Sequence, residues 1–253
     1  MLRIITRRLI PGFLFVLALA YLLPLSAQQG GGQQRTAPET PRQALAEAPR
    51  ASNAPPILKV VWVRPPEQTA QVPVIQTNIA DPNIELKQYG AAAKDLLTSG
   101  TPGSESTPFT VWSGTCTGPF AITFRLKNGA MDLTGLGRIR WMVKTSGFHE
   151  VRPVLKLADG TLIVGDHTDA SVPMFANREF ALADVRWIKL DPERVVTVST
   201  PGGTANQIWV NNPDLSKVEE AGFADLMPGS GHGTGGYIHL GGIEIYGKVV
   251  PRS

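Results

Sequence analysis

The feature that most constrains the fold of this chain is a two-residue alternation of apolar and polar side chains. In LGRIRWMVKTSG, residues 136–147, Ile139, Trp141 and Val143 alternate with mostly basic or polar side chains. Successive side chains of a β-strand point to opposite faces of the sheet. The pattern therefore predicts a strand with one buried and one exposed face.

Similar segments recur along the chain with turn residues between them. The segments predicted to contain strands are 57–63, 107–126, 136–147, 150–166, 184–191, 206–215 and 235–248. Helical patterning is confined to 89–97 and 214–223. Many short strands with turn signals at intervals of roughly 8–12 residues are typical of sandwiches. We expect an all-β fold, an antiparallel β-sandwich or jelly roll with one or two short helices.

The N-terminal residues 1–27 read as a secretory signal peptide. A basic start is followed by an apolar run that ends at Ser26 and Ala27, which is the order of such signals. Retention as a membrane anchor is the alternative, and it would be the chain's contact with a membrane. Residues 28–56 are rich in Gln, Gly, Pro and Ala and predict a disordered linker. Residues 57–253 then form one β-sandwich domain that is secreted or periplasmic and bacterial in type.

The charge balance argues against nucleic acid as a partner. The whole chain has 24 basic and 21 acidic residues. Arg3, Arg7 and Arg8 fall in the predicted signal peptide, so the mature chain would be left with 21 of each sign. No basic run elsewhere suggests a phosphate-binding surface.

Cys116 is the single cysteine of the chain. An exported domain without an intramolecular disulfide must be stabilised by its core alone. No activating base lies close in sequence, so we interpret Cys116 as a small buried apolar residue and not as a nucleophile.

The C-terminal strand GGIEIYGK, preceded by a glycine-rich loop, resembles the last strand of galactose-binding-like jelly-roll modules. These include many carbohydrate-binding domains of secreted bacterial enzymes. The resemblance implies a non-catalytic sandwich with a glycan site in its loops or on one face, and often a structural Ca²⁺. Its carboxylate candidates are Glu67, Asp81, Glu85 and Glu244, and no spacing selects among them. No other cofactor is indicated.

The glycine-rich stretch GSGHGTGG lacks the lysine of a phosphate-binding loop, and a strand pattern follows it. Gly229, Gly231 and Gly233 are also spaced wrongly for a dinucleotide fingerprint, which must open a helix. We therefore expect no nucleotide partner. The stretch is either a connection between strands or a ligand loop in which His232 binds a hydroxyl or a metal.

A second set of polar side chains flanks the turn sequence ADG of the hairpin 150–166. In an antiparallel hairpin centred on this turn, each residue faces a partner such that the two residue numbers sum to about 319. The polar residues then meet at the open end of the hairpin. The set comprises His149, Glu150, Arg152, Asp166, His167 and Asp169. They could form exposed ion pairs, contact a sugar, bind a metal or perform acid–base chemistry.

The five tryptophans all lie on predicted strands, where inward positions belong to the core. Trp209 is the best candidate for exposure, because Asn211 and Asn212 follow it and an amide suits hydrogen bonding to sugar hydroxyls. Tyr237 and Tyr246 are weaker aromatic candidates.

Three classes of function are consistent with these features. The first, which we favour, is an exported non-catalytic carbohydrate-binding or adhesion-type module whose partner is a glycan or a cell-envelope polysaccharide. The second is a glycan-active hydrolase or lyase that uses the Asp, Glu and His residues of the 149–169 hairpin. The third is an envelope structural protein without a small ligand. The favoured class is not an enzyme, and the second class keeps an enzymatic role open.

Overall fold

The computed structural model describes residues 54–69, 71–199, 208–227 and 235–252. The chain divides into two compact units, Met1–Ala48 and Pro49–Ser253, and all described residues belong to the second. The predicted signal peptide, the predicted linker up to residue 53 and His232 therefore lie outside the described residues. The described part contains no helix that is long and apolar enough to cross a membrane.

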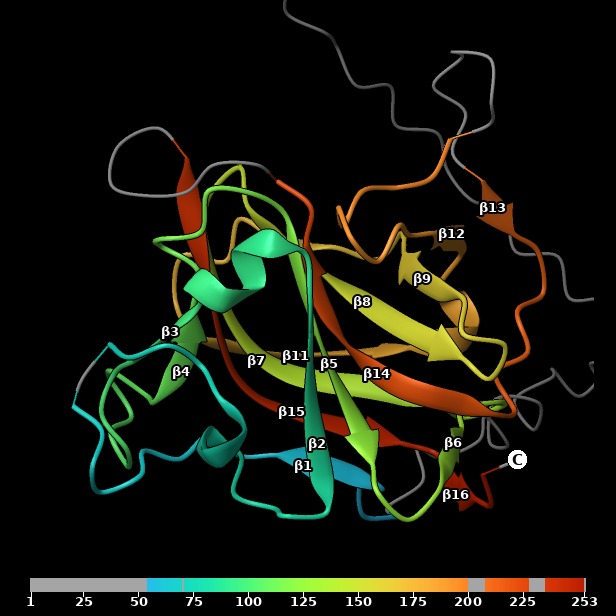
Figure 1. Ribbon diagram of the computed structural model, residues 1–253, viewed down its shortest axis with the longest axis horizontal. Helices are drawn as coiled ribbons and strands as arrows, with labels where there is room; N and C mark the ends of the chain where they lie inside the picture. The colour runs from blue at the N-terminus through green and yellow to red at the C-terminus, as the bar shows by residue number, and fades with distance from the viewer. Residues whose placement is uncertain (1–53, 70, 200–207, 228–234, 253) are drawn as a thin grey trace, which may run out of the picture. The chain divides into compact units, whose positions relative to one another are not determined.

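The described residues form an antiparallel all-β fold, as predicted, with two sheets (Figure 1). The strands are β1 (Leu58–Val60), β2 (Ile84–Tyr89), β3 (Leu97–Ser99), β4 (Thr110–Trp112), β5 (Phe120–Leu126), β6 (Ala130–Asp132), β7 (Arg138–Gly147), β8 (Glu150–Leu157), β9 (Leu162–Gly165), β10 (Asp169–Ala170), β11 (Ala176–Ala181), β12 (Trp187–Lys189), β13 (Trp209–Val210), β14 (Val218–Asp225), β15 (Gly236–Tyr246) and β16 (Lys248–Val250). Short 3₁₀ turns complete the fold: η1 (Gln76–Asn78), η2 (Ala91–Asp95) and η3 (Leu182–Asp184).

The first sheet, called here the β7 sheet, has the order β11-β7-β15-β4-β3, and β1 also pairs with β15. Strand β7 alternates as its sequence predicts: Ile139, Trp141 and Val143 are buried, and the residues between them are partly or fully exposed. Strand β15 follows the same alternation and pairs with β7 along almost its whole length. One face of this sheet therefore meets the core, and the other is open.

The second sheet, called here the β14 sheet, has the order β13-β12-β9-β8-β14-β5-β2 along its main path. Figure 1 shows β5, β8 and β14 of this sheet in front of β7 and β15. The core lies between the two sheets and includes Trp141, Phe120, Phe124 and Phe223, each almost fully buried. The rings of Phe120 and Phe223 meet edge to face with centroids 6.5 Å apart, a favourable aromatic arrangement.

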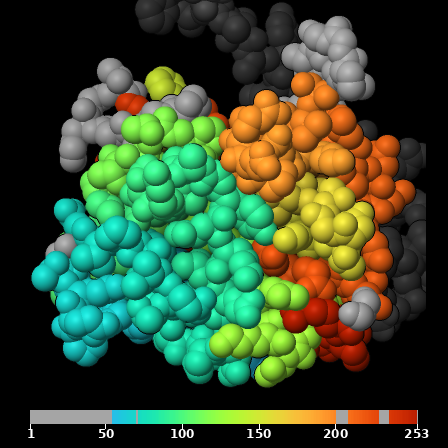
Figure 2. Space-filling view, in the orientation of Figure 1, coloured from blue at the N-terminus to red at the C-terminus, as the bar shows by residue number. Residues whose placement is uncertain are grey.

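A smaller apolar cluster covers part of the opposite face of the β14 sheet. Val154, Val164 and Ala224 contribute from its strands, and Leu190 and Val195 contribute from the loop after β12. Figure 2 shows this loop, in orange, beside the yellow segment that contains β8 and β9. The loop therefore closes over a surface that the strands alone would leave exposed.

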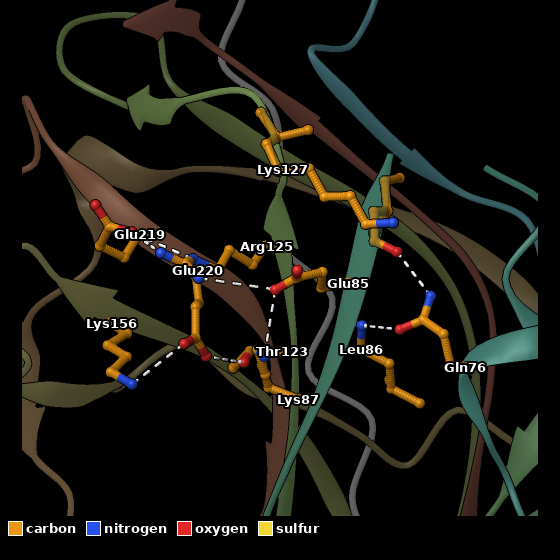
Figure 3. A network of polar contacts seen from close by, with 12 residues as sticks. Gln76, Glu85, Leu86, Lys87, Thr123, Arg125, Lys127, Lys156, Glu219 and Glu220 are labelled. Atoms are coloured by element: carbon orange, nitrogen blue, oxygen red, sulfur yellow. Dashed lines mark hydrogen bonds and ion pairs between the residues drawn. The ribbon is translucent and has the colours of Figure 1, made fainter. Parts of the chain in front are cut away.

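Buried polar residues also join the strands of the β14 sheet on that face. The carboxylate of Glu220 is only 3% exposed and accepts hydrogen bonds from Tyr89 (2.7 Å) and Thr123 (2.5 Å). The Lys156 ammonium lies 3.2 Å from its other oxygen. Figure 3 shows Glu220 between Lys156 and Thr123. These contacts link β2, β5, β8 and β14 by charge-assisted hydrogen bonds, which are stronger than neutral ones.

Both predicted helical segments differ from expectation. Segment 89–97 contains only the 3₁₀ turn η2, and segment 214–223 runs into the central strand β14. The first part of segment 214–223 is a turn, in which Asp214 accepts a hydrogen bond from the backbone amide of Ser216 at 2.9 Å. The helical prediction was wrong there because β14 pairs with strands on both sides, and tertiary pairing overrides local propensity.

The predicted β8–β9 hairpin exists, but its register differs by one residue. Val154 pairs with Val164 and Leu155 with Ile163, so paired residue numbers sum to 318. Residues 158–161 connect the two strands. Gly160 among them has a φ of +85°, the left-handed conformation that is common in short hairpin loops. A shift of one residue moves side chains to the other face of the sheet. The register shifts again where β10 pairs with β8, so that Asp169 lies opposite Val151 and not opposite Glu150.

Candidate functional site

The polar residues predicted to cluster at the open end of the hairpin are separated in the structure. His149 is 2% exposed, and its Nδ1 lies 2.5 Å from a carboxylate oxygen of Asp225, which is fully buried. The two residues lie 76 positions apart in sequence. His149 is therefore part of the interior at the end of β14 and not a surface ligand.

Glu150 and Arg152 pair with each other, with Nε of Arg152 donating to the carboxylate at 2.7 Å. Asp166 instead accepts hydrogen bonds from the backbone amide and from Nε of Arg186, both at 2.8 Å. Arg152 therefore pairs with Glu150, and Asp166 pairs with Arg186. These pairs are ordinary surface ion pairs, each worth about 0–1 kcal/mol.

Asp169 lies at the edge of the core. It accepts a hydrogen bond of 2.6 Å from the indole nitrogen of Trp141, and His167 lies 3.5 Å away. Burial alone would raise the pKa of Asp169, but the hydrogen bonds from His167 and Trp141 outweigh it and lower that pKa. The His167 ring stacks on Phe180 with centroids 3.8 Å apart. This arrangement positions core side chains and leaves little of the carboxylate for a ligand.

Trp209 is exposed, as predicted, at 42%. The tryptophan and Asn211 lie in a surface hollow of about 740 Å³ together with Arg186. The guanidinium of Arg186 lies 4.7 Å from the Trp209 ring centroid, a cation–π contact. One face of this ring is therefore already occupied by a protein side chain.

Polar and aromatic side chains form an ordered array on the outer face of the β7 sheet. Each position of β7 that points away from the core has a cross-strand partner on β15. The pairs are Arg138 with Tyr246, Arg140 with Glu244, Met142 opposite the Gly241–Gly242 bulge, Lys144 with His239, and Ser146 with Tyr237. Alternate residues of one strand are roughly 7 Å apart. The array is therefore an extended strip and not a single point.

One end of the strip is an aromatic cluster of Trp112, Phe175, Tyr237 and His239. The His239 ring lies 5.2 Å from the Tyr237 ring, 5.5 Å from Phe175 and 6.2 Å from Trp112. Burial, helped by the nearby charge of Lys144, lowers the pKa of His239 from 6.5 to about 4. His239 is therefore neutral at physiological pH. The cluster presents aromatic edges and faces with hydroxyl and ring-nitrogen groups among them.

The middle of the strip is the floor of a groove of about 500 Å³. Met142 and Gly242 lie on this floor, and the segments 61–63 and 102–109 supply a wall. A Cβ atom on Gly241 would lie 2.1 Å from Cε of Met142. The glycine pair therefore keeps the floor low, because any side chain at Gly241 would displace Met142.

The other end of the strip is charged. The Glu244 carboxylate lies 2.9 Å from the ammonium of Lys59 and 3.8 Å from the guanidinium of Arg140, and the hydroxyl of Tyr246 donates to it at 2.7 Å. Burial acts to raise the pKa of Glu244, but the hydrogen bonds from Lys59 and Tyr246 and the nearby positive charges lower it. Glu244 is therefore an ionised acceptor that is fixed in place.

Of the residues singled out in the sequence, Tyr237, Tyr246 and Glu244 belong to this strip. Trp112, Met142 and His239 were not selected. Their signal was available in part, since Met142 and His239 occupy outward positions of alternating strands. No group of three or more potential metal ligands occurs among the described residues.

No protein-family model matches the chain, and no curated protein matches it either. The structure is similar to family 11 carbohydrate-binding modules. One, from Clostridium thermocellum, was solved in complex with a β-1,3-1,4-mixed-linked tetrasaccharide; it is 12% identical, the match covers 72% of this chain and 98% of the module, and the TM-score is 0.39. Another, from the cellulosomal cellulase Lic26A-Cel5E of Clostridium thermocellum, is 12% identical over 74% of this chain and 99% of the module, with a TM-score of 0.41. An exo-β-agarase is matched over 26% of its own length and 73% of this chain, at 10% identity and a TM-score of 0.35. At these identities the likeness concerns the fold alone.

Proposed function

We propose that this protein binds a polysaccharide chain along the outer face of the β7 sheet. The observation that carries the proposal is the continuity of the strip, from the aromatic cluster over the glycine floor to the charged end. A polysaccharide is a long ligand with apolar ring faces and hydroxyl edges. A long surface with aromatic side chains and fixed polar groups is complementary to both.

The two ends of the strip would make different contacts. Tyr237 and Trp112 offer ring surface for stacking against a sugar ring, and the neutral His239 ring offers a nitrogen to a hydroxyl. At the other end, Asn177 and Arg140 are exposed donors beside the groove. Glu244 is an acceptor already oriented by Lys59 and Tyr246. Preoriented groups lower the ordering cost of binding.

The state of Glu244 favours binding without hydrolysis. A glycosidase requires a carboxylic acid whose pKa is raised so that it can protonate the leaving oxygen. The pKa of Glu244 is lowered instead, so it stays ionised at neutral pH and cannot fill that role. We therefore include a non-catalytic role in the proposal. Release of reducing sugar ends from a bound polysaccharide would refute this part.

We also propose that the protein is exported, with a polysaccharide of the cell envelope or the surroundings as its partner. The basic, then apolar, then small-residue order of residues 1–27 supports this part of the proposal. Expression of the full chain in a bacterium, followed by cell fractionation and mass measurement, tests it. A cytoplasmic product that keeps residues 1–27 would contradict it.

The binding face is tested by isothermal titration calorimetry with a panel of soluble polysaccharides. Tyr237→Ala removes a ring of the aromatic cluster and is expected to weaken binding at least tenfold. Trp209→Ala is the matched control, because it removes an exposed ring outside the strip and should leave the Kd unchanged. If Trp209→Ala abolishes binding while Tyr237→Ala does not, the hollow around Trp209 and Asn211 is the site.

A further inference from the structure

The residues that line the strip carry more positive than negative charge. Lys59 and Arg140 line the groove together with one carboxylate, Glu244. Lys144 lines the adjoining hollow beside Tyr237, where no acidic residue contributes. The linings of these two hollows therefore have three cations against one carboxylate. Beside them, Glu179 of β11 lies opposite Arg140 and pairs with Arg138 at 3.1 Å. The predicted mature chain has equal numbers of acidic and basic residues, so this excess is local and not a property of the whole protein.

Lys144 is the most informative of these cations. Its ammonium lies 5.6 Å from the centroid of the Phe175 ring. Its cross-strand partner His239 is neutral at physiological pH. None of the ion pairs formed by the described residues includes Lys144. The segment 228–234, which precedes β15, contains no acidic residue in sequence. Lys144 therefore presents its charge beside the aromatic cluster.

Arg140 also keeps unused hydrogen-bonding capacity. Its Nη1 lies 3.8 Å from Glu244, and its side chain is 45% exposed. It also contacts the hydroxyl of Tyr246. Lys59 is the closer partner of that carboxylate at 2.9 Å. A guanidinium has five N–H donors in a planar fork that matches the two oxygens of a carboxylate or sulfate. Two contacts leave several of these donors for an anionic group.

Arg140 and Lys144 point to the same face of β7, since four positions separate them, and lie roughly 13 Å apart along the strand. The Met142 floor lies between them. A chain that crossed this floor would pass one cation at each end. Negative groups attached to its sugar rings could reach both cations without leaving the aromatic cluster.

We propose that the ligand of this strip is an anionic polysaccharide, whose carboxylate or sulfate groups are bound by Arg140 and Lys144. This inference rests on the proposed binding face and narrows its ligand class. The shared chemistry is a planar or tetrahedral oxyanion on a sugar ring. Uronic-acid chains and sulfated chains are the two sources of that group.

The test compares each anionic polymer with its own neutral form, so that the backbone is held constant. Polygalacturonate is measured against its fully methyl-esterified form, and a sulfated galactan against its desulfated form, by calorimetry at 50 and 200 mM salt. We expect at least one anionic form to bind at least tenfold more tightly than its neutral counterpart. We also expect that preference to fall as the salt concentration rises.

Two substitutions assign the preference to the strip. Lys144→Met keeps an apolar stem over Phe175 and removes the charge, and Arg140→Gln removes the planar guanidinium. Each should weaken binding of the anionic form about tenfold and should weaken binding of the neutral form much less. Lys94→Met is the control, since Lys94 is exposed on η2 and lies outside the strip. It changes the net charge by the same amount and should have no effect.

The outcomes separate this inference from the proposed function. If charged and neutral forms bind with equal affinity and Tyr237→Ala weakens both, the anionic preference is overturned. The proposed binding face would still stand. Anionic preference that survives both Lys144→Met and Arg140→Gln would also overturn the inference. Absence of binding to every polymer of the panel would overturn the proposed function itself.

Discussion

Nδ1 of His239 and the hydroxyl of Thr110 lie 2.9 Å apart, in a hydrogen bond that joins β15 to the neighbouring strand β4. Thr110 is buried, and the pKa of His239 is lowered to about 4 by burial. The bond fixes the orientation of an imidazole ring that stays uncharged. The aromatic end of the strip thus depends on a contact below the surface.

The first prediction concerns the pH dependence of folding. The pKa of a histidine in the unfolded chain is about 6.5, whereas the pKa of His239 in the folded protein is about 4. The unfolded state therefore binds more protons between these values, and stability falls as the pH decreases from about 6.5 to 4, by up to about 3 kcal/mol from this residue. Urea denaturation of the parent protein and of His239→Gln at pH 7, 5.5 and 4.2 measures the effect. The substitution should make the stability less dependent on pH, and parallel pH profiles would contradict the assignment.

A second prediction follows from the buried carboxylate of Glu220. Glu220→Ala would leave Lys156 and the Tyr89 hydroxyl without their common partner. The Lys156 side chain is 32% exposed and stays partly hydrated, so the loss is that of hydrogen bonds to a charged group, about 1.5–3 kcal/mol. Chemical denaturation should show a loss of this size. Glu193→Ala, at an exposed position, is the matched control and should change stability by less than about 0.5 kcal/mol. A similar small change for Glu220→Ala would show that its contacts contribute little.

The third prediction concerns the reactivity of Cys116. Burial, together with the negative charges of Asp95 and Asp225, raises the pKa of the Cys116 thiol to about 12. A thiol reacts through its thiolate, so the folded protein at pH 8 should react with a maleimide or disulfide reagent far more slowly than the unfolded protein. The measurement is the labelling rate in buffer and in denaturant. Comparable rates in both would show that the thiol is accessible and ionised in the fold.

The alternation of the predicted strands was enough to predict the all-β fold and to single out Trp209 as the exposed tryptophan. Trp62, Trp141 and Trp187 are all at most 5% exposed, whereas Trp209 is 42% exposed. The candidate site was less accessible to sequence reasoning, because it depends on which strands become neighbours. His239 acquires its functional setting only when β15 pairs with β7 and β4.

The same limit explains the predicted hairpin cluster. Local sequence placed His149 and Asp169 among polar neighbours, which favoured a surface site. Their actual partners are Asp225 and Trp141, which lie 76 and 28 positions away. Long-range pairing turned both residues into parts of the interior. A polar residue type alone does not distinguish a ligand contact from a satisfied buried group.

The fourth prediction tests why segment 214–223 is extended. A Cβ on Gly222 would lie 2.0 Å from the carbonyl oxygen of Ile122 and 2.6 Å from Cα of Thr123. These are backbone atoms and cannot move without disturbing the pairing of β14 with β5. Gly222→Ala should therefore destabilise the fold by several kcal/mol, at least about 3, as overpacking does at its upper range. Gly118→Ala is the control, because its nearest contact would be at 3.8 Å. Equal melting temperatures for both variants would refute the close approach of the strands.

The last prediction tests the floor of the groove through Gly241 and Met142. A Cβ on Gly241 would lie 2.1 Å from Cε of Met142 and 3.1 Å from its Cβ. The end of a methionine side chain is flexible, so Gly241→Ala should cost little stability and should push Met142 up into the groove. Polysaccharide binding is then expected to weaken several-fold while the melting temperature changes by only a few degrees. Truncation of the clashing side chain should reverse the effect: in a Met142→Ala background, adding Gly241→Ala should cause no further loss of affinity. Calorimetry of the four proteins measures this coupling. Additive losses would mean that Met142 does not mediate the effect, and that the glycine pair has a different role in the strip.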